Sequence, residues 1–354
     1  MPPPPRSICI LRLSALGDVT HVLPVVTALR AAWPDTTITW IIGKIEHRLL
    51  AALPDVEFIV VDKAHGRSGL QTLRQQLAGR RFDALLLMQL ALRANLLSTA
   101  VRADLRIGYD RQRSKELHGM FINRRIDPQA TERLHVLDAL AAFVQPLGLP
   151  AITTPRWNFP IGDEARAWAR EQLPGQMRTL LISPCSSHAL RNWLPDRYAA
   201  VADHAVRRGW RVALCGGRSV PERQMADAIL AAMAHPVLDL TGKDSLAQLP
   251  ALLERADLVL SPDSGPVHIA NAVGTRVLGL YACTDPRRSG PYSDLRWTVN
   301  RYPQAAEQLL RKPASALRWG TKIERDGAMT LITVDAVIAA FDRCTADQAA
   351  GVAR

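Results

Sequence analysis

The sequence predicts an α/β protein built on parallel sheets. Short apolar runs typical of buried strands alternate with longer segments in which apolar residues recur at helical spacing. The alternation occurs in both halves of the chain, and a proline-rich stretch at 148–160 lies between them. Because a parallel strand is reached through a crossover connection, we expect each half to form a sheet with helices on both faces.

Length and composition favour two globular domains. The chain has 354 residues, of which 48% are hydrophobic and 22% charged, which excludes a disordered or fibrous protein. We place an N-terminal domain at 1–160, a C-terminal domain at 161–330 and a final helical segment at 331–354. The uncharged apolar stretches at 19–29 and 84–92 are shorter than a bilayer span, and the N-terminus lacks an export-signal pattern. A cytoplasmic location is therefore predicted.

In the first half, the strand and helix patterns alternate from residue 7 onward. Strands are predicted at 7–13, 37–43, 57–62 and 84–88, and helices at 19–33, 46–53, 68–77 and 132–147. Basic residues concentrate between Arg93 and Arg125 without clear periodicity. That segment is either a solvated loop or an anion-binding surface.

The second half repeats the design. Strands are predicted at 179–183, 211–215, 237–240, 258–262 and 276–281, and helices at 163–173, 195–208, 222–233, 245–255 and from 266 onward. The pattern loosens between 286 and 327, and an apolar helix at 334–344 closes the chain.

The stretch 258–271 has the pattern of a phosphate-binding turn. Its apolar run breaks at Asp263-Ser264-Gly265-Pro266, which suits a tight turn followed by a helix start, with Ser264 as the cap. Such a helix start directs free amides and a positive dipole end toward a ligand, and His268 adds a donor on the first turn. The alternative is an ordinary strand-to-helix turn in which Asp263 and Ser264 only cap.

Asp18 is the candidate general base. It follows Gly17 at the carboxyl end of the first predicted strand, where open α/β sheets bind ligands. A carboxylate there can take a proton from a hydroxyl, or it can simply cap the next helix. His21, one helical turn later, either assists or packs.

A second polar cluster follows strand 179–183. Ser186, Ser187 and Arg191 offer two hydroxyls and a forked guanidinium, which together suit a phosphate, although they also suit a surface turn. After strand 211–215, a Gly-Gly turn precedes Glu222, a candidate acceptor of hydrogen bonds from a ribose or a base edge. A nucleophilic Cys185 is a weaker alternative.

Charge and cysteine content limit the partners. The formal net charge is +11, from 44 Lys and Arg against 33 Asp and Glu, and it predicts an anionic partner such as a phosphorylated substrate, a membrane surface or nucleic acid. The five cysteines form no Cys-x-x-Cys pair, which favours buried thiols over a zinc site or a disulfide framework. The chain also has no Asp-x-Asp motif, so we predict no bound metal and no cofactor.

Three segments together resemble the family 9 glycosyltransferases, the bacterial ADP-heptose:lipopolysaccharide heptosyltransferases, and among them most closely the OpsX-like branch. The segments are LSALGDVTHVLP at 13–24, SSHALRNWLP at 186–195 and DSGPVHIA at 263–270. The resemblance implies a GT-B fold, in which two Rossmann-like domains face each other across a cleft and the last helix packs back on the first domain. It also implies acceptor contacts mainly in the first domain and sugar-nucleotide contacts mainly in the second.

The resemblance also assigns roles residue by residue. Asp18 matches the catalytic base. The matching donor contacts are Ser186, Ser187 and Arg191 for the diphosphate, Glu222 for the nucleoside, Asp244 near the adenine, and Asp263, Ser264, Gly265 and His268 for the heptose and phosphates. Weaker acceptor contacts fall on Gly17, His21, Arg93, Arg111 and Arg113. Two features depart from the family: Arg191 stands where lysine is common, and the segment 286–327 is longer and more basic.

The implied activity is an inverting, metal-independent transfer of heptose from ADP-heptose to the Kdo-lipid A inner core of lipopolysaccharide. An anionic acceptor would match the basic first domain, and a lipid-anchored one would bring the enzyme into transient contact with the inner membrane. One alternative is a related transferase that uses another nucleotide sugar for exopolysaccharide or another glycan. A basic regulatory or nucleic-acid-binding protein is a second, supported only by the net charge, because no helix-turn-helix, zinc or aromatic RNA-binding motif is found.

Overall fold

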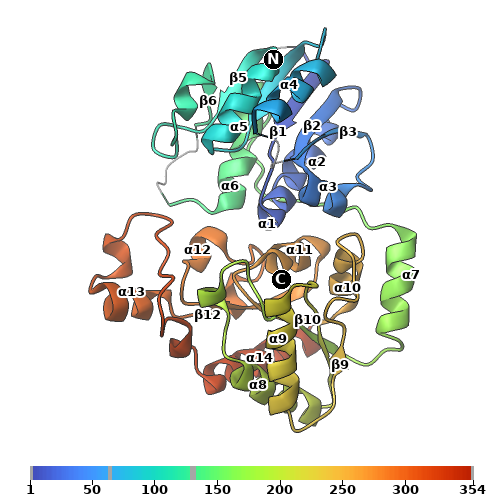
Figure 1. Cartoon of the computed structure of the whole chain (residues 1–354), viewed down its shortest axis with the longest axis vertical. Coiled ribbons are helices and arrows are strands. Elements are labelled where there is room, and N and C mark those ends of the chain that lie inside the picture. The colour runs from blue at the N-terminus through green and yellow to red at the C-terminus, as the bar shows by residue number, and fades with distance from the viewer. Residues whose placement is uncertain (1–2, 63–65, 128–132, 352–354) are drawn as a thin grey trace. The chain divides into compact units, whose positions relative to one another are not determined.

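A computed structural model gives the fold for residues 3–62, 66–127 and 133–351. The chain divides into two compact units, Met1–Pro160 and Ile161–Arg354 (Figure 1). Each unit contains one six-stranded sheet, and every strand pairing in the two sheets is parallel. The predicted α/β class is therefore confirmed.

The first unit has the strand order β3-β2-β1-β4-β5-β6. Its strands are β1 (Ser7–Leu11), β2 (Thr37–Gly43), β3 (Val56–Val61), β4 (Phe82–Leu87), β5 (Ala103–Gly108) and β6 (Arg124–Arg125). Its helices are α1 (Leu16–Thr20), α2 (Leu23–Ala32), α3 (Lys44–Leu50), α4 (Gly66–Gln76), α5 (Leu92–Leu97) and α6 (Val136–Ala141), with short 3-10 turns η2 (Ser98–Ala100), η3 (His118–Met120) and η4 (Ala142–Leu147).

Burial on both faces explains the apolar strands of this unit. Cys9 and Leu11 of β1 share one core with Leu73 on helix α4, whereas Ile8 and Ile10 point to the opposite face and are equally buried. The predicted helix 19–33 forms as two helices, α1 and α2, because Pro24 in the first turn of α2 has no amide hydrogen to continue a helix from α1. The first residue of the predicted helix 132–147 lies outside the described residues.

The basic segment between Arg93 and Arg125 is more regular than the sequence predicts. It contributes α5 and the two strands β5 and β6 to the first sheet. Strand β6 has only two residues, and β5 is partly exposed, so neither has the continuous apolar run that marks β1 or β4. A two-residue edge strand such as β6, and a partly exposed strand such as β5, carry little signal in a sequence.

The second unit has the strand order β12-β11-β10-β7-β8-β9. Its strands are β7 (Thr179–Ile182), β8 (Arg211–Leu214), β9 (Leu238–Asp239), β10 (Leu258–Pro262), β11 (Arg276–Tyr281) and β12 (Val299–Asn300). Its helices are α7 (Asp163–Gln172), α8 (Pro195–Arg207), α9 (Val220–Ala232), α10 (Leu249–Arg255), α11 (Gly265–Val273), α12 (Pro286–Ser289), α13 (Tyr302–Leu310) and α14 (Val334–Ala349), with 3-10 turns η5 (Ala189–Arg191), η6 (Leu295–Trp297), η7 (Ala314–Ala316) and η8 (Met329–Leu331).

The last helix, α14, lies in the second unit and packs within its core, and its expected return to the first domain stays a prediction. Its apolar face, with Val337 and Phe341, is part of the main core of the second unit. The Phe341 ring lies edge-on to Trp210 at 5.3 Å, and Arg276 donates a hydrogen bond to the Cys344 carbonyl at 3.1 Å. The apolar face that the sequence predicts for this helix is thus buried within the second unit, against α8, β11 and β12.

The segment 286–327 is also ordered, although its sequence pattern is loose. It supplies α12, β12 and α13, and β12 pairs with β11 at the edge of the sheet. Tyr302, Ala305 and Ile323 form a small core of their own. None of the helices in the described part of the chain is long and apolar enough to cross a membrane.

Candidate functional site

Each sheet has one point where the strand order reverses. In the first unit the chain builds β2 and β3 on one side of β1, and then β4, β5 and β6 on the other. In the second unit β8 and β9 lie on one side of β7, and β10, β11 and β12 on the other. The loops after β1 and β4, and after β7 and β10, therefore diverge at the carboxyl edge of each sheet, where open α/β sheets usually bind ligands.

At the reversal point of the first unit, Arg12 and Asp18 form an ion pair. Arg12 follows β1, and its Nη2 lies 2.5 Å from Asp18 Oδ2 while its Nη1 donates to the Met88 carbonyl at 2.5 Å. Burial alone would lower the pKa of Arg12, but Asp18 and Tyr109 outweigh burial and raise it. The Asp18 side chain is 36% exposed, so this carboxylate sits beside a lasting positive charge and is open to solvent.

Gly17 and His21 have internal roles in the first unit. The Gly17 carbonyl accepts a hydrogen bond from Thr20 Oγ1 at 2.6 Å. His21 is only 2% exposed, and its ring lies edge-on to His135 at 5.6 Å. His21 is thus packed inside the first unit, and its predicted contact with an acceptor stays a prediction.

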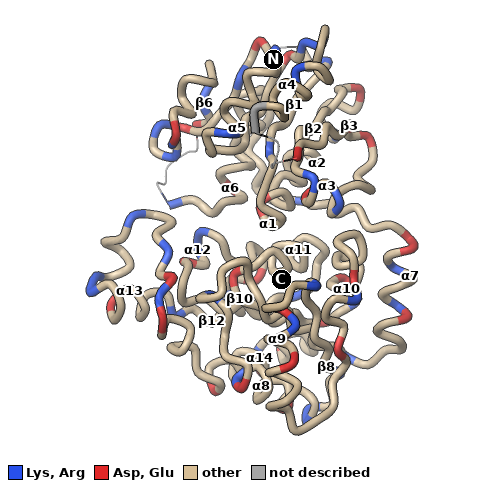
Figure 2. Tube along the Cα trace, viewed as in Figure 1, with Lys and Arg blue, Asp and Glu red and all other residues tan. Residues whose placement is uncertain are grey.

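The predicted acceptor arginines differ in burial and pairing; Figure 2 marks the described Lys and Arg residues of the chain in blue. Arg93 in α5, after β4, and Arg111, after β5, are exposed. Arg113 is half-buried and forms an ion pair with Asp110 at 2.6 Å, so its charge is largely neutralised within its own turn. Arg93 and Arg111 are thus more exposed than Arg113.

The loop after β7 holds the first part of the predicted phosphate cradle. The Ser186 amide donates to Asn192 Oδ1 at 2.7 Å, and Ser186 Oγ donates to the His188 carbonyl at 3.0 Å. Ser187 is exposed. These bonds fold the loop back on itself and bring Arg191, at the end of η5, to the carboxyl edge of the sheet.

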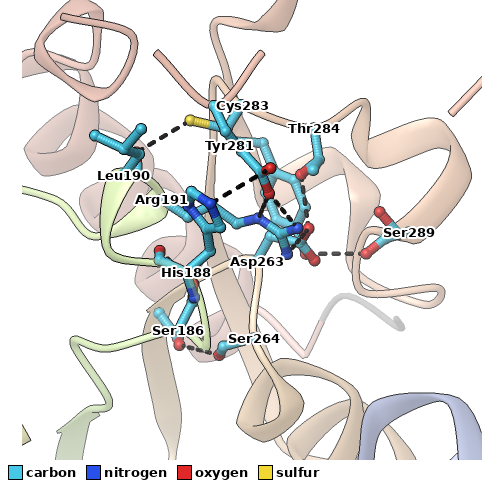
Figure 3. Close-up of polar contacts among 12 residues, drawn as sticks. Ser186, His188, Leu190, Arg191, Asp263, Ser264, Tyr281, Cys283, Thr284 and Ser289 are labelled. Carbon is cyan, nitrogen blue, oxygen red and sulfur yellow. Dashed lines mark hydrogen bonds and ion pairs between the residues drawn. The ribbon is translucent and has the colours of Figure 1, made fainter. Parts of the chain in front are cut away.

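Arg191 lies between two carboxylates (Figure 3). Its Nη1 is 3.3 Å from Asp263 Oδ2, and Asp263 also accepts a hydrogen bond from Thr284 Oγ1 at 2.8 Å. On another edge of the guanidinium, Nε and Nη2 donate to Glu324 Oε1 at 2.8 and 2.6 Å. Burial alone would raise the pKa of Glu324. The opposing effect of Arg191, Lys322 and His188 is larger, so the pKa is lowered overall and the carboxylate is charged.

The start of α11 completes this cradle. Pro266 occupies the first turn, as predicted, but Ser264 does not cap the helix with its side chain. Its Oγ is instead 2.8 Å from Ser261 Oγ, which in turn donates to the Ser183 carbonyl at 2.7 Å. The cap predicted for Ser264 is therefore wrong, because a hydroxyl chain between the β7 and β10 loops takes its place. His268 is 9% exposed on the first turn.

Glu222 stabilises the turn after β8. Its Oε1 accepts from the Gly217 amide at 2.8 Å, its Oε2 accepts from Ser219 Oγ at 2.6 Å, and Ser219 caps α9. A Cβ on Gly217 would lie 2.6 Å from Glu222 Oε2, so a larger residue there would displace the Glu222 carboxylate. The Ser-x-x-Glu spacing of 219–222 is that of a capping box, but Glu222 binds the Gly217 amide and the Ser219 hydroxyl, so only the Ser219 half of that motif is formed.

Asp244 lies close enough to Glu222 for their charges to interact. Burial, with a smaller contribution from Glu222, raises its pKa to about 6, although a backbone hydrogen bond and Arg218 both act to lower it. The backbone brings these loops together, because the Gly242 amide donates to the Gly216 carbonyl at 2.8 Å and Arg218 Nε donates to the Gly242 carbonyl at 3.0 Å. The predicted nucleoside contacts Glu222 and Asp244 are therefore neighbours at one end of the carboxyl edge.

The chemistry of Cys185 argues against a nucleophile. Burial, with a contribution from Glu222, raises the pKa of its thiol to about 11, so the thiolate is scarce at neutral pH. Cys9, Cys215, Cys283 and Cys344 are buried free thiols. Within residues 3–62, 66–127 and 133–351, no three His, Cys, Asp or Glu side chains gather as a metal-binding group.

The sequence interpretation missed Arg12 and Glu324. A charged residue directly after the apolar run of β1 was a usable signal for Arg12. Glu324 lies in a segment without periodicity, and the Ile323 amide joins it to the end of the second sheet through a 2.7 Å hydrogen bond to the Cys283 carbonyl. No local pattern predicts the contact between Glu324 and Arg191, because the two residues are 133 positions apart in the sequence.

Residues 70–318 match glycosyltransferase family 9 (heptosyltransferase). The chain is 42% identical over 335 residues to lipopolysaccharide core heptosyltransferase OpsX of Haemophilus influenzae, a match that covers 94% of this chain and 95% of that protein. It is 24% identical over 278 residues to lipopolysaccharide heptosyltransferase 3 of Escherichia coli, covering 76% and 80% of the two chains.

Solved structures share the fold. A family 9 glycosyl transferase of Veillonella parvula superposes with a TM-score of 0.78 at 24% identity, covering 96% of each chain. ADP-heptose lipopolysaccharide heptosyltransferase II of Escherichia coli superposes with a TM-score of 0.71 at 18% identity, covering 97% of this chain and 99% of that one. These likenesses confirm the predicted GT-B fold.

The raised pKa of Asp244 predicts a pH dependence of stability. Because its folded-state pKa of about 6 lies above the ordinary aspartate value of 3.8, ionisation favours the unfolded chain, and the stability present below pH 3.8 is lost as the pH rises through 6. Asp244→Asn should therefore gain stability over the wild type across that interval, by up to about 3 kcal/mol. Urea denaturation at several pH values measures it, with exposed Asp326→Asn as control; a difference that does not change with pH would contradict the assignment.

Proposed function

Since the chain belongs to glycosyltransferase family 9 and is a heptosyltransferase, we propose that it transfers a heptose from ADP-heptose to the Kdo-lipid A inner core of lipopolysaccharide. The observation that carries the proposal is the cradle at the β7/β10 reversal point, where Arg191 meets the start of α11. A guanidinium and the amides of a helix start are the groups that bind a diphosphate in proteins.

On the donor side, the proposal assigns the diphosphate to Ser186, Ser187 and Arg191, with His268 on the adjoining helix turn. Glu324 takes one edge of the Arg191 guanidinium, and the remaining N–H groups can bind phosphate oxygens. Asp263 keeps acceptor capacity for a sugar hydroxyl although Thr284 and Arg191 also bind it, because a carboxylate accepts several hydrogen bonds.

Glu222 and Asp244 are assigned to the nucleoside. Glu222 Oε1 and Oε2 each accept one hydrogen bond from the turn after β8 and retain further lone pairs. Gly265 contributes the first helical amide of α11 without a side chain in the way of the ligand.

On the acceptor side, Asp18 is assigned as the general base. Arg12 favours the ionised carboxylate, which is the form that can accept a proton. The acceptor O–H proton passes to Asp18, the oxygen bonds to the anomeric carbon, and the bond from that carbon to the phosphate oxygen breaks with its electron pair leaving on ADP. Attack in line with the leaving group inverts the anomeric centre.

The charge that develops on ADP needs a counter-charge. Arg191 and the amides at the start of α11 supply it in this proposal, which assigns no metal or cofactor to the reaction. The acceptor is itself anionic, and the exposed Arg93 and Arg111 are the groups assigned to it. We infer that the enzyme acts at the cytoplasmic face of the inner membrane, where a lipid-anchored acceptor would lie.

Asp18→Asn tests the base. The amide cannot take the proton, so kcat should fall by about 100- to 10,000-fold, while ADP affinity, which the proposal assigns to the second unit, stays unchanged. Steady-state transfer assays and calorimetry with ADP measure the two quantities. Asp35→Asn, which changes an exposed carboxylate of the same unit, is the matched control. Near-normal turnover by the Asp18 variant would remove it from the mechanism.

Arg191→Ala tests the cradle. Loss of the charged donor should weaken ADP binding by about 10- to 100-fold, because hydrogen bonds to charged groups contribute about 1.5–3 kcal/mol. Calorimetric titration with ADP measures the change. The control is Arg208→Ala, whose side chain is 59% exposed and paired with Asp342. An unchanged ADP affinity in the Arg191 variant would show that the diphosphate binds elsewhere.

A further inference from the structure

Glu324 reaches the phosphate cradle from a segment that the second unit fixes in place. The Ile323 amide donates to the Cys283 carbonyl at 2.7 Å, and Tyr302 Oη donates to the Thr321 carbonyl at 2.8 Å. Ile323 and Tyr302 are also buried in the same small core. Because burial and hydrogen bonds both hold the backbone just before Glu324, its carboxylate has a defined position at the cradle.

The two carboxylates beside Arg191 take three of its five N–H groups. Nε and Nη2 donate to Glu324 Oε1 at 2.8 and 2.6 Å, and Nη1 donates to Asp263 Oδ2 at 3.3 Å. Among the described residues, these contacts leave one N–H group on each of the two terminal nitrogens of Arg191. Two such groups allow a guanidinium to bind a phosphate through two parallel hydrogen bonds.

Water screens the pair of Arg191 and Glu324 only weakly. Their side chains are 13% and 21% exposed. Ion pairs at a fully exposed surface contribute little, because solvent screens them and because both side chains must be ordered to form them. Here both side chains are largely covered, and Arg191 is further held at the end of η5 by its amide, which donates to the His188 carbonyl at 2.9 Å. The pair therefore constrains the orientation of the guanidinium.

The charges of the cradle argue that Glu324 does not serve to attract an anion. Arg191 carries one formal positive charge, whereas Asp263 and Glu324 carry two negative charges between them. A second carboxylate beside the cation repels a diphosphate. A favourable contribution of Glu324 to a diphosphate site must therefore come from the geometry that it imposes on Arg191.

Glu324 and the loop after β7 share a common support. Glu324 Oε2 lies 3.6 Å from His188 Nε2, so both of its oxygens face side chains of that loop. In addition, Cys283 Sγ donates to the Leu190 carbonyl at 3.2 Å (Figure 3). The Cys283 carbonyl also accepts from the Ile323 amide, so one residue just after β11 contacts both the Arg191 loop and the segment of Glu324.

This arrangement suits arginine and not lysine. A guanidinium has separate nitrogens, so Glu324 can hold the Nε side while the terminal nitrogens meet a ligand. A lysine ammonium has one nitrogen, and a carboxylate that held it would compete with the phosphate for that nitrogen. An effect of Glu324 on donor binding should therefore depend on whether residue 191 is arginine or lysine.

We propose that Glu324 is a positioning residue of the donor site, which holds the Nε side of Arg191 so that the terminal N–H groups face the diphosphate. Glu324 touches no substrate in this scheme and acts through Arg191. The inference rests on the proposed function, since it supposes a nucleoside diphosphate in the cradle. It gives the segment 286–327 a defined contribution, namely the carboxylate that orients Arg191.

A double-mutant cycle on ADP affinity tests this role without the transfer reaction. In the wild-type background, Glu324→Ala should weaken ADP binding by about 3- to 10-fold, because the loss of orientation outweighs the loss of a repelling charge. In the Arg191→Lys background, the same change should leave ADP affinity unchanged or strengthen it, because only the repulsion is removed. Calorimetric titration of the full chain with ADP measures both effects.

Two further variants control for folding and for charge. Glu324→Gln keeps the size of the side chain and one acceptor oxygen, so it should unfold in urea like the wild type and lose less ADP affinity than Glu324→Ala. Asp326→Ala removes an exposed carboxylate of the same segment and should change ADP affinity by less than about twofold, because solvent screens it.

Two results would overturn the positioning role. They are an equal effect of Glu324→Ala on ADP affinity in both backgrounds, and tighter ADP binding by Glu324→Ala in the wild-type background. Transfer assays separate this inference from the proposed function. Wild-type transfer from ADP-heptose with equal effects in both backgrounds rejects only the positioning role. The expected cycle on ADP affinity without any heptose transfer rejects only the proposed function, and a wild type that binds no ADP rejects both.

Discussion

The reversal of strand order beside β1 and beside β7 is the constraint on which both candidate sites depend. Parallel strands end at one edge, and adjacent loops part only where consecutive crossovers turn to opposite sides. Arg12 and Asp18 lie at the first reversal, and Arg191 and Asp263 lie at the second. The fold thus places the charged groups of both sites at the ends of strands whose buried residues are mostly apolar.

The phosphate cradle of the second unit depends on the pairing of one cation with two carboxylates. Arg191 is held by Asp263 and Glu324, and lysine at the same position would have to divide one compact ammonium between them. The planar guanidinium instead uses separate edges, so it can be oriented by carboxylates and still offer donors to a phosphate. The unusual arginine and the long segment that delivers Glu324 are therefore two parts of one arrangement. The role assigned to this segment is to fix the orientation of the cation that the donor meets.

The sequence predicted an element correctly where that element depends on neighbouring residues alone. The apolar runs of β1 and β10, and Pro266 at the start of α11, follow from burial and helix-end chemistry and were predicted correctly. The hydroxyl chain from Ser264 and the pairing of Glu324 with Arg191 were not, because each depends on segments distant in sequence. The roles of the predicted site residues stay predictions, but the structure brings the Arg191, Asp263 and Ser186 loops to one sheet edge.

The central claim is that this chain moves a heptose from ADP-heptose to a lipid-linked inner-core sugar. The most direct measurement is a transfer assay with Kdo-lipid A and a panel of donors, ADP-heptose, GDP-mannose and UDP-glucose, followed by mass spectrometry of the lipid product. The account predicts that one heptose is added from ADP-heptose with release of ADP, and that the other donors give no product. Faster transfer from a GDP- or UDP-linked sugar, or an unchanged acceptor with ADP-heptose, would contradict it.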